Sequence, residues 1–190
     1  DIVEYTLRIY NEGDIAGYAK EIKDNINSII EEQNSNILVS INYPVTHIKA
    51  FDQILDTDVE KIYDQFKKEY ESFQSLSEES ELNIDYTYDI VNDRYYNVTL
   101  TIFTSSSKLA HPITEMHTYV YDKKEKKLLL FSDLMNEEER KKLVPKIQEY
   151  LLHNYKDCVL LEEMQSYVNP NTNYLFTIDD TNLTIYFDPY

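Results

Sequence analysis

The sequence predicts an α+β domain, in which antiparallel sheets built from hairpins carry amphipathic helices packed on one face. Several segments alternate apolar and polar residues and are joined by short polar turns, which is typical of hairpin strands with one buried face. Single segments with apolar residues at helical spacing lie between these strands. The chain has 190 residues, of which 42% are hydrophobic and 13% aromatic, so it can bury a substantial core.

The N-terminal part is predicted to contain a strand, a helix and a second strand. Residues 4–10 are expected to form the first strand, which the polar segment 11–13 ends. Asp14 is expected to cap a helix whose isoleucines recur at helical spacing as far as Ile30. Residues 37–44 alternate in polarity and predict the second strand.

The middle of the chain is predicted to hold the longest helix, followed by a hairpin. Residues 52–73 place apolar side chains at helical spacing along one side, which makes this segment the clearest amphipathic helix. Residues 82–90 and 95–104 alternate between apolar and polar side chains. Asn92 and Asp93 lie between them and tolerate a positive φ, so we expect a two-residue hairpin turn there.

The C-terminal part is predicted to add a strand with a short return, a capped helix and a closing hairpin. Asn136 and Glu139 have the spacing of a capping box, and Pro145 inside the helix predicts a kink or a later start. Tyr150 is expected on the buried side of this helix. The expected elements are strands at 113–121 and 128–131, a helix at 137–155, a short helix at 159–167, and strands at 174–178 and 183–187.

Three parts are expected along the chain. Residues 1–36 form an N-terminal strand and helix, residues 37–108 a first α+β lobe, and residues 109–190 a second α+β lobe. No segment rich in Gly, Pro or Ser separates the lobes, so the alternative is that they form one compact unit.

Charge and composition exclude several classes of function. The 18 Lys and Arg against 35 Asp and Glu give a net charge of −17, which argues against a protein that binds the nucleic-acid backbone. Two glycines are too few for a nucleotide-binding loop. The single cysteine, Cys158, excludes an intrachain disulfide framework and a cysteine-based zinc cluster. The negative field favours a basic partner.

One predicted strand carries residue types that bind metals. His111, Glu115 and His117 share one strand face if the strand is unbroken, and histidine and carboxylate side chains are common ligands of divalent metals. Glu115 and His117 are near enough to reach one ion, whereas Pro112 places His111 in a loop. A polar strand face is the default interpretation, and a metal-dependent hydrolase using Glu115 and His117 is the rival hypothesis.

The eighteen tyrosines offer faces for sugars or peptides, because each ring combines an apolar face with a hydroxyl. Most occupy core positions of the predicted elements. Tyr95 and Tyr119 are expected to be exposed, which makes them candidates for a partner surface.

Two further motifs carry no predicted function. Asp56 and Asp58 lack the glycine and the later glutamate of a calcium loop. Asn97 begins an Asn-Val-Thr glycan-acceptor motif, which a bacterial origin would leave unused.

Several segments resemble a known bacterial domain family. They are residues 37–44, the end of the long helix at 66–70, the hairpin through Asn92 and Asp93, and the segments 109–112, 118–122, 127–134 and 185–190. Together they resemble the RsiV-like domain, a domain of unknown function found in lysozyme-sensing anti-sigma factors and N-terminal to the catalytic part of peptidoglycan polysaccharide deacetylases. The resemblance covers residues 37–190. The family's Gly-Gly-Ala-His turn is replaced here by Lys108, Leu109, Ala110 and His111.

The resemblance implies a non-catalytic, extracytoplasmic binding or spacer module at the surface of a Gram-positive cell. Its parent would be a membrane-anchored peptidoglycan polysaccharide deacetylase, with the anchor before Asp1 and the catalytic domain after Tyr190. The alternative parent is a lysozyme-sensing anti-sigma factor. A cationic protein such as a lysozyme, or the cell-wall glycan, is the expected partner, and no catalytic residue, cofactor or metal is expected. The candidate partner-binding residues are His111, Glu115, His117, Tyr95 and Tyr119.

Overall fold

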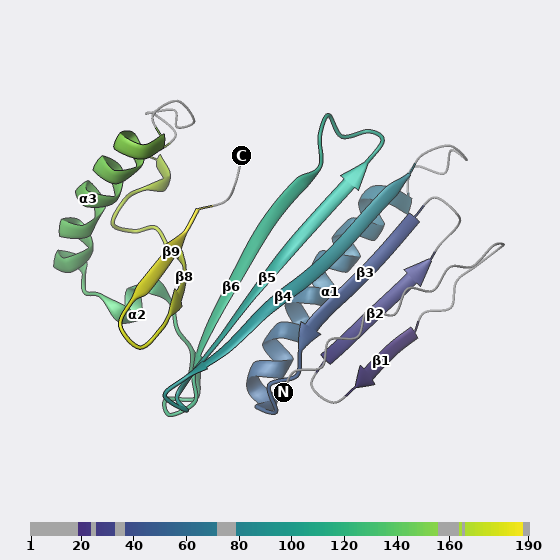
Figure 1. Ribbon diagram of the computed structural model, residues 1–190, viewed down its shortest axis with the longest axis horizontal. Coiled ribbons are helices and arrows are strands. Elements are labelled where there is room, and N and C mark those ends of the chain that lie inside the picture. Colours follow the sequence, from purple (N-terminus) through teal and green to yellow (C-terminus); the bar gives the residue numbers. More distant parts are fainter. Residues whose placement is uncertain are drawn as a thin grey trace.

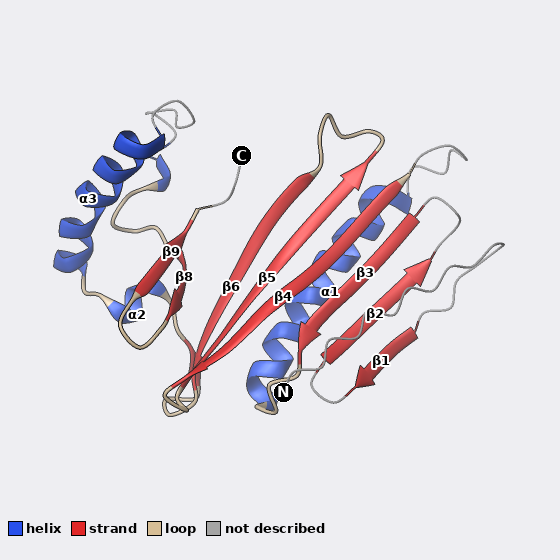
Figure 2. Ribbon diagram, in the orientation of Figure 1, coloured by secondary structure: helices blue, strands red, loops and turns tan. Residues whose placement is uncertain are grey.

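The computed structural model of the chain describes residues 19–23, 26–32, 37–71, 79–155, 164 and 166–187. They form a seven-stranded sheet, a two-stranded sheet and the helices α1, α2 and α3, which confirms the predicted α+β class (Figures 1 and 2). The large sheet contains β1 (Ala19–Lys23), β2 (Ile26–Glu32), β3 (Ile37–Pro44), β4 (Ser80–Val91), β5 (Tyr95–Ser106), β6 (Ile113–Asp122) and β7 (Lys127–Leu128). The other elements are α1 (Lys49–Glu71), α2 (Phe131–Leu134), α3 (Glu137–Tyr155), β8 (Leu175–Ile178) and β9 (Leu183–Tyr186).

The seven strands lie in chain order across the large sheet. Neighbouring strands are antiparallel, except that β3 and β4 pair in parallel, with Ile37 opposite Ser80 and Ile41 opposite Ile84. A parallel pair needs a long crossover connection, and α1 provides it on one face of the sheet (Figure 1). The prediction of purely antiparallel sheets is therefore wrong at this one pair.

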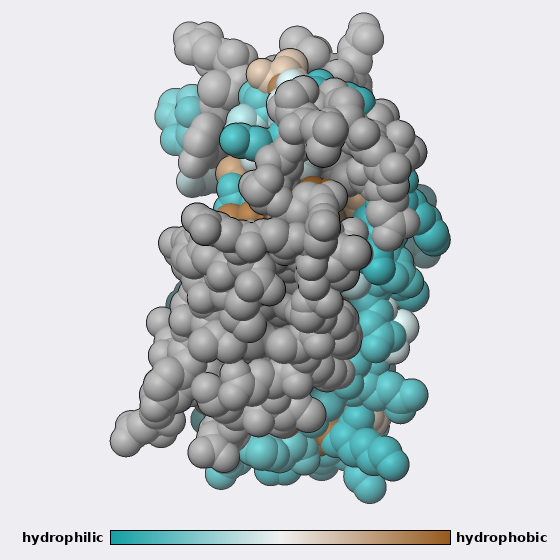
Figure 3. All heavy atoms as spheres, turned by 90° about the vertical axis from the view of Figure 1, so that its right-hand side faces the viewer, coloured by the Kyte–Doolittle hydropathy of each residue, from teal (hydrophilic) through white to brown (hydrophobic). Residues whose placement is uncertain are grey.

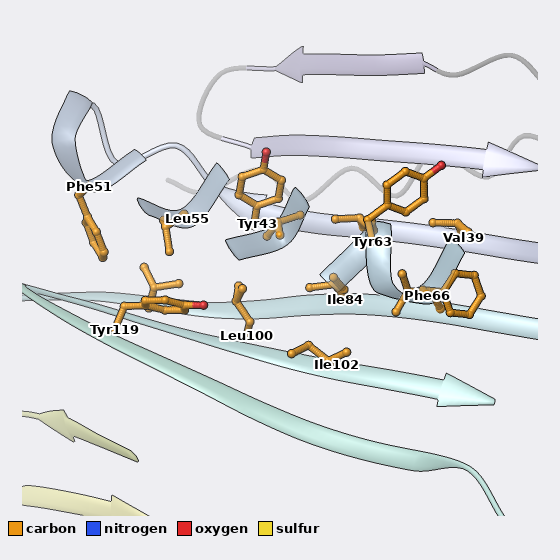
Figure 4. Packing of buried hydrophobic residues seen from close by; sticks show 14 of the residues in the cluster. Val39, Tyr43, Phe51, Leu55, Tyr63, Phe66, Ile84, Leu100, Ile102 and Tyr119 are labelled. Carbon is orange, nitrogen blue, oxygen red and sulfur yellow. The ribbon is translucent and has the colours of Figure 1, made fainter. Parts of the chain in front are cut away.

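The first hydrophobic core lies between α1 and the sheet. Phe51 and Leu55 of α1 are fully buried and lie over Leu100 and Tyr119 of the sheet (Figure 4). Phe51 also stacks on Tyr121 of β6, with ring centroids 5.0 Å apart. Burial of each large apolar side chain contributes about 1.5–3 kcal/mol, so this core accounts for the docking of α1.

A second hydrophobic core lies on the opposite face of β6. Tyr119 and Tyr121 belong to the first core, whereas Val120 between them belongs to the second. Consecutive side chains of a strand point to opposite faces, so the two cores are on different sides of β6. Phe131 of α2 and Val144 of α3 pack in the second core. The prediction that all helices pack on one face is therefore wrong.

The helix predicted after Asp14 is wrong for the part of it that the structure describes. Residues 19–23 and 26–32 form β1 and β2, which pair antiparallel, and β2 pairs in turn with β3. Isoleucine is β-branched and favours strands, and pairing with β3 outweighs the helical spacing of these residues. Residues 4–10 and Asp14 lie outside the described residues.

The hairpin between β4 and β5 differs from the prediction by one residue. Asn92 and Asp93 have the expected positive φ, at 53° and 54°. Val91 pairs with Tyr95, however, so the turn contains three residues instead of two.

Helix α3 begins and runs as predicted. Glu139 N donates to Asn136 Oδ1 at 3.0 Å and Asn136 N donates to Glu139 Oε2 at 2.8 Å, which confirms the capping box. Pro145 lies inside the helix. Tyr150, expected to be buried, is 60% exposed, because Val144 and its neighbours take the inward positions.

The large sheet crosses the lobe boundary expected after residue 108, since β5 pairs with β6 along the whole length of β6. The division into two lobes stays a prediction. Among the described helices, none is long and apolar enough to cross a membrane. The described atoms in the view of Figure 3 are predominantly hydrophilic, with small hydrophobic patches.

Candidate functional site

A carboxylate on α1 is hydrogen-bonded to two side chains of β6. Asp58 Oδ2 lies 2.7 Å from His117 Nδ1 and accepts a hydrogen bond from the Tyr119 hydroxyl. The Tyr119 hydroxyl also lies 3.4 Å from His117 Nδ1. His117 and Tyr119 are two residues apart on β6 and therefore point to the same face, toward α1. These three residues are called the Asp58 cluster below.

Burial and hydrogen bonding act in opposite directions on Asp58. Desolvation raises the pKa of its carboxyl, but the hydrogen bonds from His117 and Tyr119 and the attraction of His117 and Lys61 outweigh it, so the pKa lies below 3.8. Burial raises the pKa of the Tyr119 hydroxyl, and the hydrogen bond to Asp58 raises it further. At neutral pH the cluster therefore combines an ionised carboxylate with a neutral phenol.

A cavity of about 590 Å³ lies beside β6 and is called the β6 cavity below. Glu115, Met116 and His117 line one side of it, and residues from the C-terminal segment line the other, including Tyr167 and Tyr186. Consecutive strand residues point to opposite faces, so a cavity that touches three of them in a row lies along the edge of β6. Tyr186 belongs to β9, the strand nearest the C-terminus in Figure 1.

Side chains of the sheet hold the wall of the β6 cavity in place. Asn97 of β5 exchanges two hydrogen bonds with the backbone of Ile178 on β8, at 2.8 and 3.1 Å. Phe176 N of β8 donates to Thr118 Oγ1 of β6 at 2.9 Å. Asn97 is buried, so both of its bonds are shielded from water. The hairpin of β8 and β9 is therefore fixed beside β6 by specific polar contacts.

A carboxylate organises the turn between β8 and β9. Asp179 Oδ1 accepts hydrogen bonds from the backbone amides of Thr181 and Asn182, each at 2.7 Å. Asn182 Nδ2 donates to Asp179 Oδ2 at 3.0 Å. These bonds, led by the Thr181 amide, lower the pKa of Asp179 to about 2.

Three of the five predicted partner-binding residues lie near one another on β6. Glu115 is exposed and His117 is half-buried, and both line the β6 cavity. Tyr119 is only 7% exposed and packs in the first core, so the prediction that it contributes to an exposed surface is wrong. Because side chains alternate between the two faces of β6, Tyr119 points toward α1, where Asp58 accepts a hydrogen bond from its hydroxyl.

The other two predicted residues lie elsewhere. Tyr95 is half-buried at the start of β5, with the Arg94 guanidinium 4.7 Å from its ring centroid. His111 is exposed before β6, and its Nδ1 donates to the Pro112 carbonyl at 3.0 Å. Neither Tyr95 nor His111 lines the β6 cavity.

The metal hypothesis lacks a third ligand in the part of the chain that the structure describes. No group of three or more His, Cys, Asp and Glu side chains with the arrangement of a metal site occurs among these residues. The carboxylate bonded to His117 is Asp58, not Glu115. A hydrolase built on Glu115 and His117 stays a prediction.

Sequence reasoning missed the roles of Asp58 and Asn97. Asp58 follows Leu55 by three residues and precedes Ile62 by four, so it occupies a position in the apolar stripe of the helix. A carboxylate in an apolar stripe needs a hydrogen-bond partner where the helix packs, so its position in the sequence indicates a polar contact with the sheet. Asn97 lies on the strand face expected to be wet, and nothing in the sequence indicated that β8 covers it.

The comparisons with known proteins support the fold. No protein-family model matches the chain, and no curated protein matches it. A crystal structure of a DUF3298 family protein from Pseudomonas aeruginosa PAO1 is similar, with a TM-score of 0.54 and 14% sequence identity. The match covers 88% of this chain and 81% of that chain. The chain therefore has the fold of a DUF3298 family protein, a family related to the RsiV-like domains.

Proposed function

We propose that this chain is a non-catalytic binding domain of a Gram-positive cell-envelope protein and that its ligand enters the β6 cavity. The observation that carries the proposal is the cavity itself, which is large enough for part of a ligand and is lined mainly by apolar and aromatic groups. A few polar side chains, among them Glu115, His117 and Asn173, are placed to orient what binds there.

Exposed aromatic rings at the cavity support a binding role. Tyr167 is 66% exposed and Phe187 is 41% exposed, although both are large apolar residues. Exposed aromatic groups gathered at a concave site are typical of surfaces that bind partners. The Asp58 cluster lies at the same stretch of β6, and its hydrogen bonds fix His117 at the rim of the cavity.

A basic protein is the favoured class of partner. The net charge of −17 attracts cationic molecules and speeds their encounter at low salt. A lysozyme is one such protein. The cell-wall glycan is the second candidate, because the rings of Tyr167 and Tyr186 offer the apolar faces that sugars stack on.

The resemblance to RsiV-like domains supports the cellular context of the proposal. In this context the chain lies outside the cytoplasm, as the N-terminal part of a membrane-anchored peptidoglycan polysaccharide deacetylase or as the ectodomain of a lysozyme-sensing anti-sigma factor. The similarity to a DUF3298 family protein supports the fold that both contexts share.

Calorimetric titration of the 190-residue protein with a lysozyme and with N-acetylglucosamine oligomers tests the proposal. Binding that persists at physiological salt is expected for one of the two probes, and Tyr167→Ala is expected to weaken it about tenfold. Tyr150→Ala is the matched control, since Tyr150 is 60% exposed but does not line the cavity. Binding to neither probe, or equal effects of the two variants, would contradict the proposal.

A further inference from the structure

The outer edge of β6 has no strand partner over most of its length in the described part of the chain. β5 pairs with every residue of β6 on the inner side. On the outer side, β7 pairs only with Tyr121 and Asp122, and Leu129 N donates to the Val120 carbonyl at 2.7 Å. The remaining segment, residues 113–119, is called the open edge below.

Backbone groups of alternate residues point outward from the open edge. The Val120 carbonyl points away from β5, because it accepts the hydrogen bond from Leu129. Backbone direction repeats every two residues along a strand, so the amides and carbonyls of Thr114, Met116 and Thr118 also point outward. They repeat about every 7 Å, which is the spacing that an added strand matches.

The open edge lacks three of the features that commonly protect exposed strands, namely lysine, proline and a β-bulge. Its sequence, Ile-Thr-Glu-Met-His-Thr-Tyr, contains no lysine and no proline, and its register with β5 has no bulge. Proteins commonly use such residues and bulges to prevent an exposed edge from pairing with another chain. An edge without them is a template on which a further strand can form.

The β6 cavity lies along the same edge. Met116, with an outward backbone, lines the cavity together with its neighbours Glu115 and His117. A strand added at the open edge would therefore place some of its side chains in the cavity, opposite Tyr167 and Phe187. Backbone hydrogen bonds would give such a complex affinity, and the cavity would give it specificity.

Building on the proposed binding function, we propose that the open edge of β6 binds an extended, basic segment of a protein partner, which adds a strand to the sheet beside the β6 cavity. The charge of −17 on each chain disfavours a second copy at this edge and favours a cationic guest. Glu115 is exposed at the edge. The rings of Tyr167 and Tyr186 add a cation–π surface for lysine or arginine side chains of the guest.

Selection from a displayed library of random linear heptapeptides on the immobilised 190-residue protein tests this proposal. The expected peptides are rich in Lys or Arg, and these basic residues alternate with β-branched residues along the peptide. Hydrogen exchange of the protein is expected to show new protection at the amides of Thr114, Met116 and Thr118 when a selected peptide is bound.

Two changes test whether the backbone edge is responsible. Met116→Pro removes one outward amide without touching the inner pairing with β5, and is expected to weaken peptide binding about tenfold. Met116→Thr is the matched control, because it changes the side chain but keeps the amide. N-methylation of alternate amides in the selected peptide is expected to abolish binding to the unaltered protein, a result that does not depend on the folding of any variant.

The proposal would be overturned by an absence of enriched peptides, by acidic or helical peptides, or by binding that N-methylation leaves unchanged. A parallel titration with N-acetylglucosamine oligomers separates this result from the proposed function. If the oligomers bind and Tyr167→Ala weakens them while no peptide is selected, the cavity is a glycan site and only the edge proposal fails. If the oligomers, a lysozyme and the peptides all fail to bind, both proposals fail.

Discussion

The side-chain amide of Asn97 on β5 forms with the backbone of Ile178 on β8 the two hydrogen bonds that a neighbouring strand would form. Asn97 Nδ2 donates to the Ile178 carbonyl at 2.8 Å, and Ile178 N donates to Asn97 Oδ1 at 3.1 Å. A side-chain amide has the same donor and acceptor as a backbone amide, so one residue satisfies both groups of Ile178. This pair connects the two sheets, and the position of the β6 cavity wall depends on it.

Replacement of this amide is expected to loosen the C-terminal hairpin. Asn97→Ala removes both hydrogen bonds and leaves the polar groups of Ile178 without these partners, so the free energy of unfolding is expected to fall by about 2–3 kcal/mol. Urea denaturation measures this change. Binding at the β6 cavity is expected to weaken as well, because β9 is no longer held beside β6.

The exposed Asn154 on α3 provides the control for Asn97. Its Nδ2 donates to the Tyr150 carbonyl at 2.8 Å in an exposed position, so Asn154→Ala is expected to change the free energy of unfolding by less than about 0.5 kcal/mol. Similar losses for the two variants would show that Asn97 does not anchor the hairpin.

The buried face of a strand can be predicted where apolar and polar residues alternate without interruption. It cannot be predicted where a segment later in the chain covers a face made of polar residues. The faces of β4 and β5 toward α1 follow from alternation alone, since Ile84, Leu100 and Ile102 are all buried there. On the other face of β5, Asn97 is equally buried, because β8 packs on it. Local periodicity contains no information about a contact between residues 81 positions apart.

Ionised Asp58 is expected to stabilise the fold at neutral pH and to lose this effect in acid. Its pKa lies below 3.8, so the contribution is present above that value and disappears as the pH falls through the pKa of the folded state. Asp58→Asn is expected to reduce the free energy of unfolding by about 2 kcal/mol at pH 7 and by progressively less as the pH falls through the pKa of Asp58. Denaturant unfolding at several pH values measures the difference.

Asp64 on the same helix is the matched control for Asp58. It is exposed, so Asp64→Asn makes the same change in net charge without affecting the Asp58 cluster. A free-energy difference between wild type and Asp58→Asn that does not decrease at any pH below 3.8 would contradict the role assigned to the ionised carboxylate.

The N-terminal helix was predicted wrongly because spacing alone does not choose between a helix and a strand. The isoleucines of residues 19–32 fit a helical stripe, but the same residues are β-branched and meet the edge of β3. The candidate site shows the same limit. Glu115 and His117 can be placed on one face from their spacing within a single strand. Asp58 lies on a helix, 59 positions before His117, so its contact with His117 has no local signal in the sequence.

Asp122, the last residue of β6, is expected to be the strongest single polar anchor at this end of the sheet. Its carboxylate accepts hydrogen bonds from Arg94 Nε and Nη2 and from the backbone amides of Lys124 and Glu125. Asp122→Ala is expected to lower the free energy of unfolding by about 3 kcal/mol, because Asp122 is buried and all these donors lose their acceptor. Urea denaturation measures the loss.

An exposed ion pair provides the comparison for Asp122. Lys141 Nζ lies 2.7 Å from Glu137 Oε1 on α3, but both side chains are mostly exposed, so Glu137→Ala is expected to lower the free energy of unfolding far less than Asp122→Ala. The loss of stability caused by Arg94→Lys is expected to lie between those of Asp122→Ala and Glu137→Ala, since lysine keeps the charge but cannot donate two parallel hydrogen bonds to the Asp122 carboxylate. A loss for Asp122→Ala no larger than that for Glu137→Ala would contradict the anchoring role.

Asp179 is expected to stabilise the β8–β9 hairpin down to strongly acidic pH. Its pKa of about 2 means that the ionised carboxylate contributes above pH 3.8 and is lost only as the pH falls through about 2. Asp179→Ala removes the acceptor for the amides of Thr181 and Asn182, and is expected to open the turn at every pH. Asp179→Asn keeps one oxygen acceptor and is expected to have a smaller effect.

Hydrogen exchange at the Thr181 and Asn182 amides distinguishes these outcomes for Asp179. Faster exchange is expected in Asp179→Ala at pH 5, with Asp179→Asn between it and the wild type. Asp180→Ala is the neighbouring control, because Asp180 is exposed and makes none of these turn contacts. Because the hairpin forms one wall of the β6 cavity, a turn that opens in Asp179→Ala should also weaken ligand binding there. Unchanged binding would mean that the contacts of Asn97 and Thr118 hold the wall without the turn.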